Sequence, residues 1–175
     1  MNRKTTSGFT LVELLVVMAI LGVLVTLVAG GYRTAQLRGN DAQRKADLKE
    51  VANALELFYS DYGKYPDASG TQIAACSYNA NTQTGSACSW GTGEFTDNKT
   101  IYFKELPEDP SSSYYYVYRV VPDSSNQKFQ LFARMENPRD PDCLGGDCST
   151  SPLSISCGDQ VCNFAVTSAN TKATD

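Results

Sequence analysis

Residues 8–15 read GFTLVELL, and they open an apolar stretch that continues to Ala29. As a helix, residues 9–29 would extend about 31 Å at ~1.5 Å per residue, enough to cross the hydrocarbon core of a bilayer. We call residues 9–29 the apolar segment. Its few interruptions are Thr10, Glu13, Gly22 and Thr26.

Two basic residues, Arg3 and Lys4, precede the apolar segment. Basic residues beside a membrane helix favour the cytoplasmic side, so everything after Ala29 is expected outside. A secretory signal is one interpretation, but its apolar core is shorter, about 7–15 residues. A plain membrane anchor explains the length and the orientation but not Glu13, because carboxylates inside membrane helices are costly and mark function.

The string Gly8-Phe9-Thr10-Leu11-Val12-Glu13 closely resembles the processing motif of type IV pilins and type II secretion pseudopilins. The resemblance implies that a prepilin peptidase cuts between Gly8 and Phe9, that Phe9 is N-methylated, and that Glu13 is the carboxylate at the fifth mature position. A neighbouring subunit's Glu13 is then expected to pair with the cationic amine of Phe9. An isolated charge in hydrocarbon is far less favourable than a paired one, so this pairing favours assembly.

Beyond the apolar segment the pattern becomes that of an amphipathic helix. The apolar positions recur at three- and four-residue spacing, which predicts one buried stripe, with Arg44, Lys45 and other polar residues on the remaining faces. Gly63 and Pro66 predict that the helix ends at Tyr62. Residues 30–62 are therefore read as a continuation of the helix, with Gly30-Gly31 as a segment expected to melt or bend in a filament. The stripe consists of Leu48, Val51, Ala52, Leu55, Tyr59 and Tyr62.

Residues 63–175 are expected to form a globular head. The stretch 67–100 is rich in Ser, Thr, Asn and Gly and is read as a long surface loop or small subdomain. Residues 114–121 and 128–135 predict an antiparallel hairpin, the second strand half-buried by alternation. A third strand is expected at 153–156 or 163–166. The predicted fold class is α+β, a long helix packed on a small antiparallel sheet, as the resemblance to the pilin fold also implies. This resemblance extends through Tyr62-Gly63-Lys64-Tyr65-Pro66, with a looser echo at Leu106-Pro107-Glu108-Asp109-Pro110.

The even number of cysteines, all in the second half of the chain, indicates an oxidising compartment and a disulfide framework. Sequence alone leaves the pairing open, and a four-cysteine zinc site is an alternative for the last four. Major pseudopilins, which the chain resembles, often bind calcium in a C-terminal acidic loop, so Asp140, Asp142 and Asp147 are calcium candidates. A solvated acidic turn is the competing interpretation, and no other cofactor is expected. The cysteines are Cys76, Cys88, Cys143, Cys148, Cys157 and Cys162.

Composition limits the function classes. A net charge of −4 argues against nucleic acid as the main partner. The absence of histidine removes the Ser-His-Asp and Cys-His arrangements, so an enzyme is not expected.

We therefore expect a leader peptide at residues 1–8 and a structural filament subunit. It would be stored in the cytoplasmic membrane and then placed in an extracellular or periplasmic filament. The expected partners are copies of itself, other pilins, the prepilin peptidase and a membrane assembly platform. Three alternatives remain open: a true pilus subunit, a secretion or competence pseudopilin, and a membrane-tethered module that binds a metal or another ligand and does not polymerise.

Overall fold

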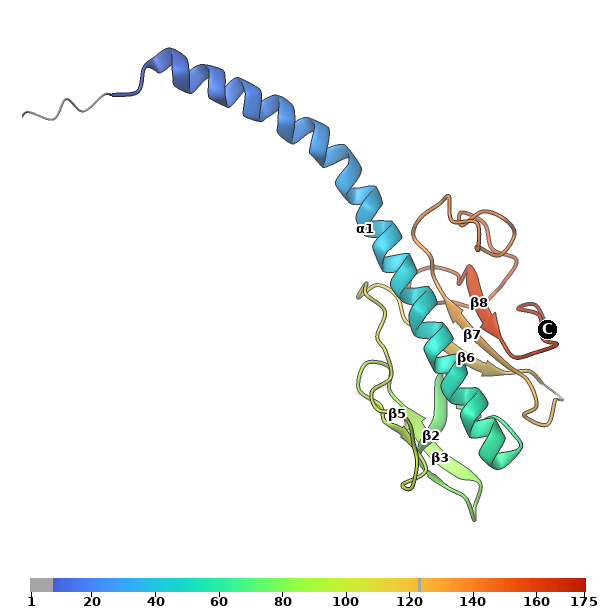
Figure 1. Ribbon diagram of the computed structural model, residues 1–175. Coiled ribbons are helices and arrows are strands. Elements are labelled where there is room, and N and C mark those ends of the chain that lie inside the picture. Colours follow the sequence, from blue (N-terminus) through green and yellow to red (C-terminus); the bar gives the residue numbers. More distant parts are fainter. Residues whose placement is uncertain (1–7, 123) are drawn as a thin grey trace, which may run out of the picture. The chain divides into compact units, whose positions relative to one another are not determined.

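The computed structural model describes residues 8–122 and 124–175, with the side chains of 27–30 left aside. It divides into two compact units, Met1–Leu37 and Arg38–Asp175, which we call the N-terminal and C-terminal units. The predicted leader falls almost wholly on residues 1–7, outside the described part. Helix α1, Leu11–Tyr62, supplies residues to both units (Figure 1).

Both ends of helix α1 follow from local sequence. Thr10 directly precedes the first helical residue, Leu11, and its hydroxyl caps the N-terminus of the helix by accepting the N–H of Glu13. At the other end Gly63 adopts a left-handed backbone with φ of +68°, and its N–H donates to the carbonyl of Tyr59 at 2.7 Å. Glycine adopts this conformation without a Cβ penalty. The predicted stop at Tyr62 is confirmed. The helix runs without a break through Gly30-Gly31, and melting there in a filament stays a prediction.

The first sheet of the C-terminal unit is antiparallel, and all of its strands except β5 lie within residues 67–100, the stretch that sequence read as a loop or subdomain. Its order is β1-β2-β4-β5, and β3 pairs with the other edge of β2. The subdomain interpretation is therefore the correct one, since Ile73 and Phe95 are fully buried between the turn-forming residues. The strands are β1 (Asp67–Ser69), β2 (Gln72–Asn79), β3 (Thr84–Cys88), β4 (Phe95–Thr96) and β5 (Ile101–Phe103).

The second sheet has the antiparallel order β6-β7-β8, with β6 at Val117–Val120, β7 at Phe129–Ala133 and β8 at Phe164–Thr167. The predicted hairpin is confirmed, with Val117 opposite Phe132 and Val120 opposite Phe129. The third strand lies at the second of the two expected places. The first strand begins later than predicted, because Tyr114 forms only an isolated bridge to Gly158.

The prediction that β7 is half-buried is wrong, since all five of its residues are buried. On one face Phe129, Leu131 and Ala133 share a core with the α1 stripe. On the other face Phe132 packs with the C-terminal cysteines, and the Gln130 amide donates to the carbonyl of Lys172 at 2.7 Å. The C-terminal segment, remote in sequence, covers the face that alternation assigned to solvent.

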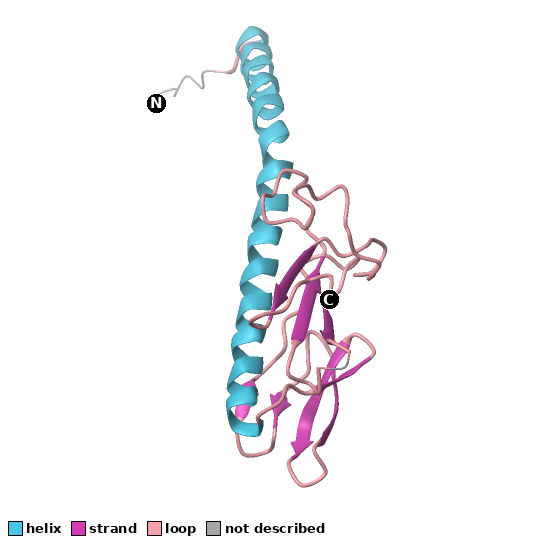
Figure 2. Ribbon diagram, turned by 90° about the vertical axis from the view of Figure 1, so that its right-hand side faces the viewer, coloured by secondary structure: helices cyan, strands magenta, loops and turns pink. Residues whose placement is uncertain are grey.

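The α1 stripe packs on antiparallel strands, as predicted, but it lies against two sheets rather than the one that was expected. Leu48, Val51, Leu55 and Phe58 are fully buried, and the strands lie alongside this half of α1 (Figure 2). Phe58 contacts four aromatic rings at centroid distances of 4.5–5.4 Å, which makes it the centre of the core. Because this packing is complete, the C-terminal unit has its own hydrophobic core.

Candidate functional site

The N-terminal unit exposes a continuous apolar surface. From Leu11 to Val25 its large apolar side chains are 47–79% exposed. Of the described helices, α1 is long and apolar enough to cross a membrane, with a window of mean hydropathy 2.9. A helix that is apolar all round is stable only when lipid or other helices cover it. The apolar segment is therefore a surface built for a non-aqueous environment.

Glu13 begins this surface and caps its own helix. Its Oε2 accepts the backbone N–H of Thr10 at 2.9 Å and the Thr10 hydroxyl at 2.7 Å. In return the N–H of Glu13 lies 3.3 Å from Thr10 Oγ1. This is a capping box, in which two side chains satisfy N–H groups that the first turn leaves without helical partners. The Thr10-x-x-Glu13 spacing is a readable signal for it that the sequence analysis did not use.

Gly8 and Phe9 lie just before the helix and belong to no helix or strand. The Phe9 side chain is 84% exposed, and a Cβ placed on Gly8 would contact nothing within 4 Å. The bond between them is thus accessible to another protein, and the Phe9 nitrogen is one residue from the Thr10 N–H that Glu13 binds. Processing at this bond remains a prediction.

A buried ion cluster in the C-terminal unit was missed by the sequence analysis, which placed Arg44 on an exposed face. Arg44 is fully buried. Its Nε and Nη2 donate to the two oxygens of Asp109 at 2.8 Å, Nη1 donates to Asp41 at 2.7 Å, and Nη2 donates to Glu136 at 2.9 Å. Burial lowers the pKa of Arg44, but the hydrogen bonds to the carboxylates, Asp109 foremost, raise it above its ordinary value.

This cluster fixes two loops to α1. Asp109 belongs to the Leu106–Pro110 stretch, and Asp41 also accepts the backbone N–H groups of Glu136 and Asn137 at 2.9 and 2.7 Å. The Asp41-x-x-Arg44 spacing on one helix face was the available signal, because residues three apart are neighbours. Its groups are enclosed and hydrogen-bonded to one another, so the cluster is a brace for the C-terminal unit.

Comparison with known proteins places these features in a family. A family model described as the prokaryotic N-terminal methylation motif matches residues 3–29. The type II secretion system core protein G of Pseudomonas aeruginosa is 33% identical over 63% of this chain and 71% of its own length. That of Aeromonas hydrophila is 30% identical over the same shares. The type IV major pilin protein PilA of Myxococcus xanthus is 35% identical over 34% of this chain and 27% of its own. No solved structure matches the chain significantly.

The chain belongs to the type IV pilin and type II secretion pseudopilin family. The residues matched by the methylation-motif model include Gly8, Phe9 and Glu13. The apolar segment fits a membrane-anchored precursor, as is expected of this family. Its relatives are pilins and pseudopilins, which are structural proteins.

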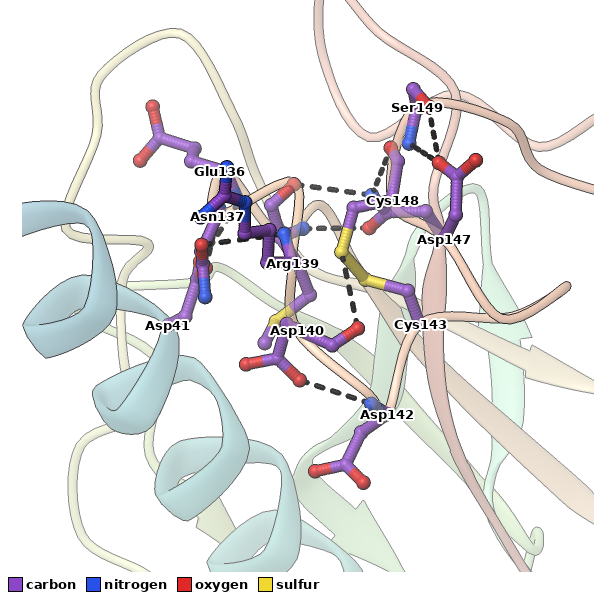
Figure 3. Close-up of a disulfide and its surroundings, with 12 residues drawn as sticks. Asp41, Glu136, Asn137, Arg139, Asp140, Asp142, Cys143, Asp147, Cys148 and Ser149 are labelled. Atoms are coloured by element: carbon purple, nitrogen blue, oxygen red, sulfur yellow. Dashed lines mark hydrogen bonds between the residues drawn. A yellow bond between two sulfur atoms is a disulfide. The ribbon is translucent and has the colours of Figure 1, made fainter. Parts of the chain in front are cut away.

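The calcium site implied by the resemblance to major pseudopilins does not fit the side chains present. Lys45 Nζ lies 2.6 Å from an oxygen of Asp140 and 2.6 Å from an oxygen of Asp142. The Asp147 carboxylate instead accepts the N–H and hydroxyl of Ser149 (Figure 3). Within the described ranges no group of three or more His, Cys, Asp or Glu residues is arranged to hold a metal. An ammonium occupies the place between the two carboxylates that a cation would need.

The six cysteines form three disulfides in this pilin-family chain: Cys76–Cys88, Cys143–Cys148 and Cys157–Cys162. The first joins β2 to β3, the second closes the acidic loop, and the third lies over the outer face of β7. The zinc alternative has no free thiol to use among these residues. The first bridge lies at the main core, whereas the other two each close a short loop of the C-terminal segment.

Proposed function

We propose that this chain is a filament subunit of the type II secretion kind. It would be stored in the cytoplasmic membrane through the apolar segment, cut between Gly8 and Phe9 by a prepilin peptidase, and methylated on Phe9. An assembly platform in the membrane would then add it to copies of itself in a periplasmic filament.

One observation carries the proposal: an exposed apolar helix surface that begins with a carboxylate. The side chains from Leu11 to Val25 have no protein cover, so lipid or neighbouring helices must supply it. A membrane covers the apolar side chains but offers Glu13 no counter-charge. A bundle of such helices provides both, because a cationic amine from another subunit can lie beside the carboxylate.

The capping box shapes how this pairing would work. Both hydrogen bonds that Glu13 accepts from Thr10 use Oε2. Oε1 accepts no hydrogen bond within the described ranges, so it is the oxygen available to a neighbour's amine. Glu13 would then cap its own helix and bind the next subunit at the same time, which couples helix order at the N-terminus to assembly.

The secretion-type assignment draws on the coverage of the relatives. Two core protein G chains are matched over 71% of their length, whereas PilA is matched over 27%. A surface pilus is the second candidate, and the match to the pilin PilA favours it. The three disulfides suit either filament, because the periplasm and the cell exterior are both oxidising. Deleting the gene distinguishes the two: loss of protein export supports a secretion filament, and loss of surface fibres seen by electron microscopy supports a pilus.

Glu13→Gln and Glu13→Ala together test the mechanism. Gln can still accept the Thr10 N–H in a capping box but carries no charge, whereas Ala loses both the cap and the charge. We expect both variants to insert in the membrane and to reduce filament yield by at least about tenfold, because neither pairs with an amine. Yield is measured in sheared filament fractions, and N-terminal processing by intact mass.

Filaments at wild-type yield in Glu13→Gln would show that the carboxylate serves only as a cap. Normal function of a membrane-held monomer lacking Glu13 would support the binding-module alternative instead. Leu21→Ala is the comparison variant: it trims one exposed apolar side chain of the same segment without touching a charge, and we expect it to lower the yield by less than Glu13→Gln does.

A further inference from the structure

Lys45 links helix α1 to the acidic loop at residues 140–149. Its Nζ lies 2.6 Å from Asp140 Oδ1 and 2.6 Å from Asp142 Oδ2. The Lys45 side chain is 28% exposed, that of Asp140 12% and that of Asp142 58%. The pair with Asp140 is therefore partly shielded from solvent, where an ion pair is screened less than at an open surface, whereas the pair with Asp142 is open to solvent.

The loop itself holds these two carboxylates together. Asp140 Oδ1 also accepts the backbone N–H of Asp142 at 3.0 Å, which turns the chain sharply. The Cys143–Cys148 disulfide closes the segment that follows. Two like charges kept this close repel each other unless a cation lies between them. The ammonium of Lys45 lies within 2.6 Å of both carboxylates and offsets this repulsion.

We propose that the Lys45 ammonium does in this chain what a bound divalent cation would do: it neutralises Asp140 and Asp142 and fixes their loop to α1, so the fold needs no metal. Its removal leaves a weak divalent-cation site at the two carboxylates. Partial burial lowers the pKa of Lys45, but the hydrogen bonds to Asp140 and Asp142 raise it above its ordinary value, so the ammonium stays charged.

Calcium and the Lys45 ammonium cannot occupy this place at the same time. Calcium binds carboxylate oxygens at about 2.3–2.6 Å, and the ammonium already lies at a similar distance from both. Calcium takes 6–8 oxygens. The Asp147 carboxylate accepts hydrogen bonds from Ser149 instead. The oxygen ligands of a calcium ion would therefore have to come from two carboxylates, backbone carbonyls and water. The vacated site is therefore expected to bind in the millimolar range of weak extracellular sites.

The test measures thermal unfolding of the full-length chain in detergent micelles, with EDTA or with millimolar calcium. We expect the Tm of the wild type to be the same in both. In EDTA, Lys45→Met should lower the Tm by about 2–4 °C, which is the shift expected when a chain of this size loses about 1 kcal/mol. Millimolar calcium should restore the Tm of this variant. Lys49→Met, an exposed lysine one turn further along α1, is the control and is expected to change neither value.

The double variant Lys45→Met with Asp142→Asn locates the site. Removing the second carboxylate should abolish the rescue by calcium, because one carboxylate is too few. If Lys45→Met does not fold in EDTA, Lys45→Gln provides the same comparison with a polar side chain of similar length. A wild-type Tm that calcium raises overturns the proposal, and so does a Tm of the Lys45 variants that calcium leaves unchanged.

Discussion

The two halves of helix α1 have the same backbone and opposite surroundings. Between Leu11 and Val25 every large apolar side chain is at least 47% exposed. Between Leu48 and Phe58 the stripe residues Leu48, Val51 and Leu55 are fully buried by the sheets of their own unit, and so is Phe58, which the predicted stripe did not include. One half finishes its packing within the chain, and the other leaves its packing to lipid or to other chains.

This contrast separates folding from assembly. Burying apolar side chains stabilises by roughly 25 cal/mol per Å² removed from water, wherever the covering surface comes from. The C-terminal unit gains that energy when it folds. The N-terminal unit gains it only in a membrane or a helix bundle. Substitutions in the two halves should therefore affect different measurements.

The largest expected effect comes from Phe58→Ala in the packed half. Phe58 is fully buried and contacts Tyr62, Tyr78, Phe95 and Tyr102. Truncation leaves a cavity and should lower the free energy of unfolding by about 3–5 kcal/mol. Denaturant titration in micelles, followed by the fluorescence of the one tryptophan, measures it. Leu21→Ala, half exposed in the other half of α1, should change the same value by less than about 0.5 kcal/mol. Equal losses for the two variants would refute the contrast.

Arg44→Met is expected to have the next largest effect, about 3 kcal/mol, the lower end of the range for removing one partner of a buried ion pair. The low end applies because Asp41 keeps its backbone donors from Glu136 and Asn137. Arg44→Lys should rescue little, since an ammonium cannot bind Asp109 with two parallel hydrogen bonds. Denaturant titration measures both, with exposed Arg38→Met as the control. If the free energies of unfolding of Arg44→Met and Arg38→Met differ by less than about 0.5 kcal/mol, hydrogen bonds to the backbone are enough to hold the two loops on α1.

The features that sequence predicted are those written in contiguous residues. The apolar segment, the stop at Gly63 and the buried stripe each depend on spacing along one helix. The motif from Gly8 to Glu13 could be read in the same way, because its residues are adjacent in the chain. The capping box could also have been predicted from the Thr10-x-x-Glu13 spacing, although its hydrogen bonds are seen only in the structure.

The features that sequence missed depend on segments far apart in the chain. A helical pattern assigns Arg44 to solvent, because its partners Asp109 and Glu136 come from other loops. Strand alternation likewise assigns one face of β7 to solvent, because the chain that covers it comes from the later segment between Leu153 and Ala173. Lys45 was placed on a polar face for the same reason. Which charges meet is decided by tertiary packing rather than by periodicity.

The smallest predicted effect sharpens the contrast at the very end of the packed half. Asp97 accepts the hydroxyl of Tyr62, the last residue of α1, at 2.6 Å. Partial burial raises the pKa of Asp97, but hydrogen bonds from the Tyr62 hydroxyl and from the backbone N–H groups of Thr100 and Lys99 outweigh it and lower the pKa to about 2. A depressed pKa in the folded state contributes stability above the ordinary value of 3.8, and that contribution is lost as the pH falls toward 2.

Asp97→Asn should therefore flatten the fall of Tm with pH in this window, because Asn does not titrate. The change should be small, since the carboxylate is only part-buried and solvent still screens its interactions. Tm is measured from pH 5 to about pH 2, the window in which a depressed aspartate titrates, for the wild type, Asp97→Asn and the control Asp159→Asn, an exposed aspartate of the same unit. An Asp97→Asn curve parallel to the wild type would mean that Tyr62 is held by ring packing on Phe58, and that the carboxylate adds nothing to the end of the helix.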